Sequence, residues 1–116
     1  MKFLMTYEQK TNVPPTPEQM AAIGKFSEEM RKSGILLMTG GLQRPTKGSR
    51  VRLSSGKFSV TDGPFAETKE LIDGFALIEV SSKGEAFAVA ERFMKIAGDG
   101  EGEVLQVFDP GGPPPG

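Results

Sequence analysis

The chain has 116 residues, a formal net charge of −1 and neither histidine nor cysteine. The length fits a single domain, and the nearly balanced charge argues against a nucleic-acid-binding protein, which needs a basic surface to neutralise phosphates. Without imidazole or thiol groups there is no Ser-His-Asp triad, no cysteine nucleophile, no disulfide and no imidazole- or thiolate-bound zinc ion.

The amino-terminal residues 1–7 alternate in the pattern of a short strand, with Phe3, Met5 and Tyr7 on one face. The apolar run is broken at Thr6, so it is too short for a signal-peptide core or a membrane span. Nothing in the composition requires an oxidising compartment. We therefore expect a cytoplasmic protein that does not contact a membrane.

The first helix is predicted to start at Pro17, because Thr16 is placed to cap it and Gln19 completes a capping box. Gly34 is placed to end it. One apolar stripe runs along this helix and predicts its buried face. The stripe consists of Met20, Ile23, Phe26 and Met30.

Residues 35–39 form an apolar run of strand length, and Gly40 and Gly41 then allow the backbone to bend or to approach another segment closely. Alternating residues at 50–53 and 57–60 predict a hairpin, with Ser55 and Gly56 as its tight turn.

The charge changes sign along the segment that contains this hairpin. Basic side chains at Arg44, Lys47, Arg50, Arg52 and Lys57 are followed by acidic ones at Asp62, Glu67, Glu70 and Asp73. The arginines are suited to bind a small anion or to pair with these carboxylates. The alternative is a pair of solvated faces, because exposed ion pairs contribute little to stability.

The carboxy-terminal part predicts a strand at residues 74–80, a helix and a final strand at 104–108. Ser82 and Glu85 form the capping box of this helix, and Gly98 ends it. Its apolar stripe is Ala86, Ala90, Phe93 and Ala97. Residues 1–109 are therefore predicted as one domain, and residues 110–116 as a flexible tail rich in proline and glycine.

Both faces of the predicted sheet are apolar. In residues 74–80, Phe75 and Leu77 alternate with Ala76, Ile78 and Val80, and residues 104–108 repeat the pattern. Two helices cover only one face, so we expect a second copy of the chain to cover the other. The alternative is that loops cover it.

Residues 62–70, with the sequence DGPFAETKE, join a rigid backbone to several functional side chains. Gly63 and Pro64 predict a stiff turn, and Phe65 is placed to fix this turn to the core. The side chains left on a defined loop are those of Asp62, Glu67, Thr68, Lys69 and Glu70. The alternative is ordinary turn chemistry, in which Asp62 bonds to nearby amides.

This run, together with the strand at residues 74–80, resembles the signature of the DGPFAETKE family within the YCII-related superfamily. Residues 1–5, residues 40–45 and the helix start near Glu85 extend the resemblance to nearly the whole chain. It implies an α+β, ferredoxin-like fold of β-α-β repeats, with an antiparallel sheet, two helices on one face and a dimer that resembles an α/β barrel. It also implies a functional association with an alternative sigma factor.

Some members of the superfamily have a proposed catalytic histidine–aspartate pair, which a chain without histidine cannot supply. We expect no cofactor. Glu67 and Glu70 have a spacing that suits a hard cation, but the run lacks the ligand density of a recognised metal loop, so we expect no metal.

Three functional hypotheses remain. The first is a dimeric small-molecule-binding or regulatory domain, in which residues 62–70, Arg50 and Arg52 border a pocket between subunits. The second is an enzyme acting on a small polar or aromatic substrate, with Asp62 as the base and Tyr7 or Lys69 as the proton donor. The third is a purely structural scaffold.

Overall fold

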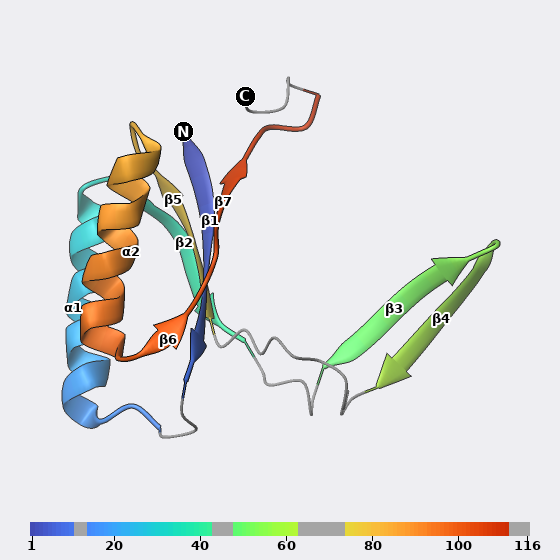
Figure 1. The fold of residues 1–116 in the computed structure, drawn as a ribbon, viewed down its shortest axis with the longest axis horizontal. Helices are drawn as coiled ribbons and strands as arrows, with labels where there is room; N and C mark the ends of the chain where they lie inside the picture. The colour runs from blue at the N-terminus through green and yellow to red at the C-terminus, as the bar shows by residue number, and fades with distance from the viewer. Residues whose placement is uncertain (11–13, 43–47, 63–73, 112–116) are drawn as a thin grey trace.

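The computed structural model describes residues 1–10, 14–42, 48–62 and 74–111. Its main sheet is antiparallel, with strand order β2-β5-β1-β6 and with β7 also paired to β1. The strands are β1 (Lys2–Gln9), β2 (Leu36–Gly41), β5 (Gly74–Glu79), β6 (Gly100–Glu101) and β7 (Val104–Val107), and the helices are α1 (Pro17–Lys32) and α2 (Lys83–Ala97). Both helices lie on one face of the sheet (Figure 1). The fold is α+β and is consistent with the predicted ferredoxin-like architecture.

Local capping chemistry determines the start and end of α1. The Thr16 hydroxyl accepts a hydrogen bond from the Gln19 amide at 3.1 Å, and the Thr16 amide donates to Gln19 Oε1 at 2.9 Å. Gly34 follows the end of the helix with a φ of 80°, a backbone conformation that favours glycine. The predicted capping box and helix end are confirmed.

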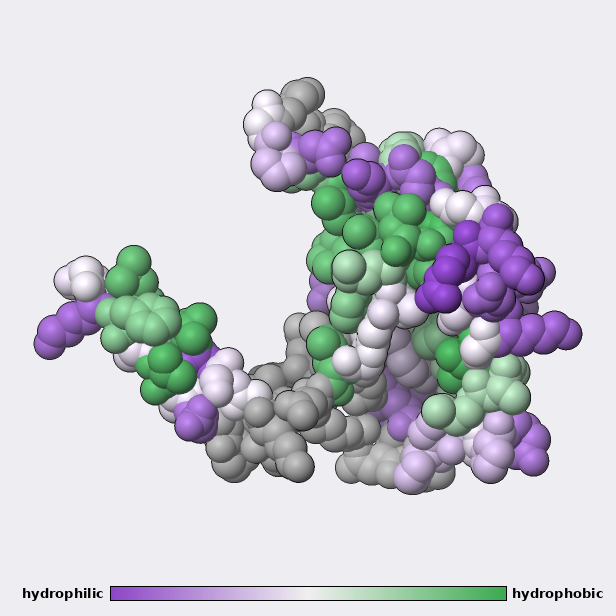
Figure 2. Space-filling view, turned by 180° about the vertical axis from the view of Figure 1, so that it is seen from behind, coloured by the Kyte–Doolittle hydropathy of each residue, from purple (hydrophilic) through white to green (hydrophobic). Residues whose placement is uncertain are grey.

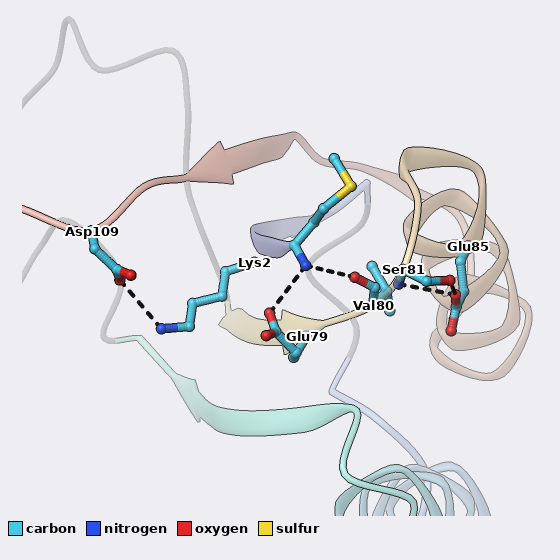
Figure 3. A network of polar contacts seen from close by, with 7 residues as sticks. Lys2, Glu79, Val80, Ser81, Glu85 and Asp109 are labelled. Atoms are coloured by element: carbon cyan, nitrogen blue, oxygen red, sulfur yellow. Dashed lines mark hydrogen bonds and ion pairs between the residues drawn. The ribbon is translucent and has the colours of Figure 1, made fainter. Parts of the chain in front are cut away.

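The start of α2 differs from the prediction in one hydrogen bond. Ser82 caps the helix by accepting from the Glu85 amide at 3.1 Å. The Glu85 carboxylate, however, accepts from the amide and hydroxyl of Ser81 (Figure 3). Ser81 offers two donors to this carboxylate, whereas the backbone of Ser82 offers one. The amino terminus is bound in the same region, where the Met1 amino group donates a hydrogen bond to the Val80 carbonyl at 2.8 Å.

The strand register decides which side chains face the helices. Phe3 lies opposite Ile78 on the helix side, and both are 1% exposed, whereas Leu4 lies opposite Leu77 on the other side. The core on the helix side consists of Phe3, Met5, Phe26, Met30, Leu36, Ile78, Val80, Ala86 and Val89.

The short strand β6 lies within residues 99–102, a polar segment rich in glycine that the sequence did not predict as a strand. β6 pairs with the end of β1, and this approach leaves no room for a side chain at Gly100 or at Gly102, which follows the strand. A Cβ on Gly100 would lie 2.6 Å from Tyr7 Cε2, and one on Gly102 would overlap the Thr6 carbonyl. Glycine is required here for close contact between the two strands.

Strands β3 (Ser49–Ser54) and β4 (Lys57–Asp62) form a separate two-stranded sheet that projects away from the main one (Figure 1). Ser55 and Gly56 make its turn with φ values of 50° and 79°, as a two-residue hairpin of type I′ requires. The predicted hairpin is confirmed. Every residue of both strands is exposed.

The face of the main sheet that is turned away from the helices is apolar, as predicted. It carries Leu4, Met38, Leu77, Leu105 and Val107, of which Met38 is 58% and Leu105 48% exposed. We call these five residues the open sheet face. That a second copy covers it, and that the pair resembles a barrel, stay predictions. None of the helices in the described part of the chain is long and apolar enough to cross a membrane.

Candidate ligand-binding pocket

A cavity of about 950 Å³ lies between the two helices and the sheet. Its walls are mostly apolar. They include the stripe of α1, here Met20, Ile23 and Phe26, and the inner side of α2 at Ala90 and Phe93. The residues that build the pocket are thus the same apolar stripes that fold the domain.

The lining residues that are exposed to solvent lie near the end of the sheet where β1 and β2 end and β5 begins (Figure 1). Met20 belongs to the predicted buried stripe of α1 but is 59% exposed, because it lies at this border of the cavity. The prediction of a buried face therefore holds for Phe26 and Met30 and is wrong for Met20.

Four residues with hydroxyl groups line the pocket, Thr6, Tyr7, Ser27 and Thr39, and the hydroxyls of Tyr7 and Thr39 donate their protons within the protein. The Tyr7 hydroxyl donates to the Gly98 carbonyl at 3.0 Å, and its ring meets Phe93 edge-on with 5.3 Å between centroids. Thr39 Oγ1 donates to the Phe75 carbonyl at 2.9 Å. A hydroxyl oxygen has two acceptor lone pairs, so Thr39 Oγ1 can accept a hydrogen bond from a ligand. Tyr7 was predicted as a proton donor to a substrate, and its proton is engaged with Gly98.

Among the described residues that line the pocket, Glu103 is the only one with a formal charge at neutral pH. Glu103 is exposed and lies between β6 and β7, and its amide donates to the Thr6 hydroxyl at 3.0 Å. The formal charge that the described lining residues place at this border is therefore a negative one.

Asp62, the predicted catalytic base, is the last residue of β4 and does not line the pocket. It is exposed, and its carboxylate accepts a hydrogen bond from the Ser49 hydroxyl at 2.6 Å across the base of the hairpin. Arg50 and Arg52 are exposed on the same hairpin and do not line the pocket either. Whether these three side chains act on a ligand stays a prediction.

Most of the signature run lies outside the described residues. This applies to Gly63, Pro64, Phe65, Glu67, Thr68, Lys69 and Glu70, and equally to Arg44, Lys47 and Asp73. Their predicted roles stay predictions. Gly74, the first described residue after this segment, lines the pocket. In the part of the chain that the structure describes, no group of three acidic residues could hold a metal ion.

The methionines of the sequence are an indication of the pocket. Four of the six methionines, Met5, Met20, Met30 and Met94, line it. Methionine is flexible and polarisable, so it is common on apolar surfaces that adapt to different ligands. Scattered along the chain, these residues appear as ordinary core positions until the fold brings them together.

Two comparisons with known proteins cover most of the chain. A sequence model of the YCII-related domain matches residues 1–109. An uncharacterized protein of Rhizobium meliloti (strain 1021) is 39% identical over 83 residues, which cover 69% of this chain and 67% of that relative.

Proposed function

Since the chain belongs to the YCII-related domain family, as its signature run indicated, we propose that it is a small-molecule-binding domain whose ligand occupies the cavity between the helices and the sheet. The observation that carries the proposal is the cavity itself. Its volume of about 950 Å³ falls within the range of roughly 300–1,000 Å³ that is typical of ligand pockets, which are mostly apolar with a few polar groups.

The polar groups define the kind of ligand. Because the Thr39 hydroxyl proton is engaged by the Phe75 carbonyl, this hydroxyl favours a ligand that donates hydrogen bonds. Glu103 disfavours an anion at the border of the cavity. The ligand is therefore a largely apolar molecule that is neutral or positively charged and carries at least one donor.

The domain also acts as a homodimer in this proposal, because the open sheet face would otherwise leave apolar side chains in water. A regulatory role beside an alternative sigma factor, which the family resemblance implies, fits a domain that changes state when it binds a ligand. The enzyme hypothesis gains no support from Asp62, which does not line the cavity.

The experiment blocks the cavity with one side chain. Ala90 on α2 lines the pocket, whereas Ala88 on the same helix is exposed and does not. We expect Ala90→Phe to weaken binding of the neutral dye Nile red by about tenfold or more, because the ring occupies space that the dye needs. Ala88→Phe adds the same ring to the solvent side and should bind like wild type.

Fluorescence titration with Nile red measures both variants, and circular dichroism confirms that each is folded. Equal affinities in Ala90→Phe and Ala88→Phe would mean that the dye binds elsewhere and would contradict the proposal.

A further inference from the structure

The β3–β4 hairpin, residues 49–62, is an arm with two different faces. Val51 pairs with Val60 and Leu53 with Phe58, so these four apolar side chains share one face. Each of the four is between 57% and 72% exposed. The arm therefore presents an apolar strip to solvent.

The opposite face of the arm is basic and polar. Arg50 and Arg52 alternate with the apolar residues of β3, and Ser59 lies opposite Arg52 on β4. This side suits contact with water, so the pattern indicates that the apolar face is the one that packs against another surface.

Within the part of the chain that the structure describes, the arm has little to stabilise it, because all residues of both its strands are exposed. A two-stranded hairpin in water is marginally stable at best without a further layer. Its four apolar side chains and those of the open sheet face are all at least partly exposed, so neither surface covers the other in one molecule. Both surfaces lie on the side of the sheet away from the helices, with a hollow between them (Figure 2).

We propose that the apolar face of each arm packs on the open sheet face of a second copy of the chain. The proposal rests on the homodimer of the proposed function and adds the element that holds it together. In a two-fold dimer, the arm of each copy packs on the open sheet face of the other copy. A single interface therefore covers both apolar surfaces of both copies.

The available apolar area is sufficient for a stable dimer. With roughly 150 Å² for a fully exposed large apolar residue, the four arm residues with Met38, Leu105 and Val107 expose on the order of 600 Å². A stable interface buries about 800 Å² on each partner, of which roughly 60% is apolar. The two apolar surfaces thus supply the apolar share of such an interface.

Cysteine cross-linking tests the contact directly, because the chain has no cysteine of its own. One sample carries Leu53→Cys on the arm and another carries Leu105→Cys on the sheet. When the two are mixed and joined with a short bis-maleimide, we expect a covalent heterodimer, seen by mass spectrometry. Ser59→Cys, on the opposite face of the arm, is the control and should give at most about a tenth of that product with Leu105→Cys.

A chain that carries both Leu53→Cys and Leu105→Cys tests whether the arm contacts the sheet of its own chain or that of a second copy. Linkage within one chain at high dilution would show that the arm folds onto its own sheet and would overturn the proposal. Equal heterodimer yields from Leu53→Cys and Ser59→Cys would overturn it as well.

Sedimentation equilibrium of Leu53→Ser/Phe58→Ser separates this proposal from the homodimer itself. Both side chains are exposed in the single chain, so the fold should persist while the dimer dissociation constant rises about 100-fold or more. An unchanged constant would overturn the role of the arm and leave the dimer intact. A wild-type protein that is monomeric at every concentration would overturn both.

Discussion

Through the hydrogen bonds of Glu85, the stability of the fold at the start of α2 depends on pH. Its carboxylate accepts two hydrogen bonds from Ser81, through the hydroxyl and the amide, and these bonds lower the pKa of Glu85 below its ordinary value of 4.5. Because the folded-state pKa lies below the unfolded one, the bonds stabilise the fold above the unfolded pKa. This contribution is lost as the pH falls through the folded pKa.

We therefore expect Glu85→Gln to lower the free energy of unfolding at pH 7 and to have a smaller effect below about pH 4. Urea denaturation at both pH values measures the difference. Glu91→Gln, on the exposed side of the same helix, is the control, because its ion pair with Lys95 contributes little. A Glu85→Gln effect that grows as the pH falls would contradict this account.

Local chemistry was predictable where one residue has one suitable partner. Thr16, Gln19 and Gly34 define α1 through neighbours within a few positions, so the sequence indicated them correctly. Glu85 has two adjacent serines as partners, and periodicity does not reveal which of them it bonds. Asp62 was recognisable as a functional candidate, but its bond to Ser49 depends on the hairpin register.

Among the elements, those with a strong period were predicted and the pocket between them was not. Both helices, the hairpin and the strands β1, β2, β5 and β7 follow from apolar patterns. The strand β6 contains only two residues, and it forms because glycine allows its backbone to approach β1 closely. The cavity depends on the distance between helices and sheet, which is a tertiary property that no local pattern contains.

The elements around the cavity predict which of two matched ligands binds better. 2-Naphthol is neutral and donates a hydrogen bond, whereas 2-naphthoate has the same rings and a negative charge. We expect the naphthol to bind about tenfold more tightly at pH 7, because Thr39 offers an acceptor and Glu103 repels an anion.

Calorimetric titration of both compounds measures the preference. Glu103→Gln should reduce the difference in affinity between the two compounds, because it strengthens naphthoate binding. Glu91→Gln, on the exposed side of α2, should leave this difference unchanged. Tighter binding of naphthoate than of naphthol to the wild-type domain would contradict the assignment of the ligand class.

At the scale of the whole molecule, the two sides of the main sheet have different surroundings. The side with Met5 and Ile78 faces the helices and the cavity, while the side with Leu4 and Leu77 is open. Because successive side chains of a strand point to opposite faces, neighbouring residues belong to different sides of the sheet. The sequence predicted both apolar sides, but it could not show that the hairpin is a separate arm with an apolar strip of its own.

If two copies bury these surfaces against each other, thermal stability must depend on protein concentration, because unfolding then separates the subunits. With roughly 0.7 kcal/mol of unfolding enthalpy per residue, a dimer of this length should gain about 3 °C in Tm for each tenfold rise in concentration. Calorimetry between about 5 and 500 μM should therefore span about 6 °C for the wild type. The Leu53→Ser/Phe58→Ser variant should show a flatter dependence over the same range. A wild-type Tm that does not change with concentration would mean that the open sheet face and the arm stay uncovered in solution.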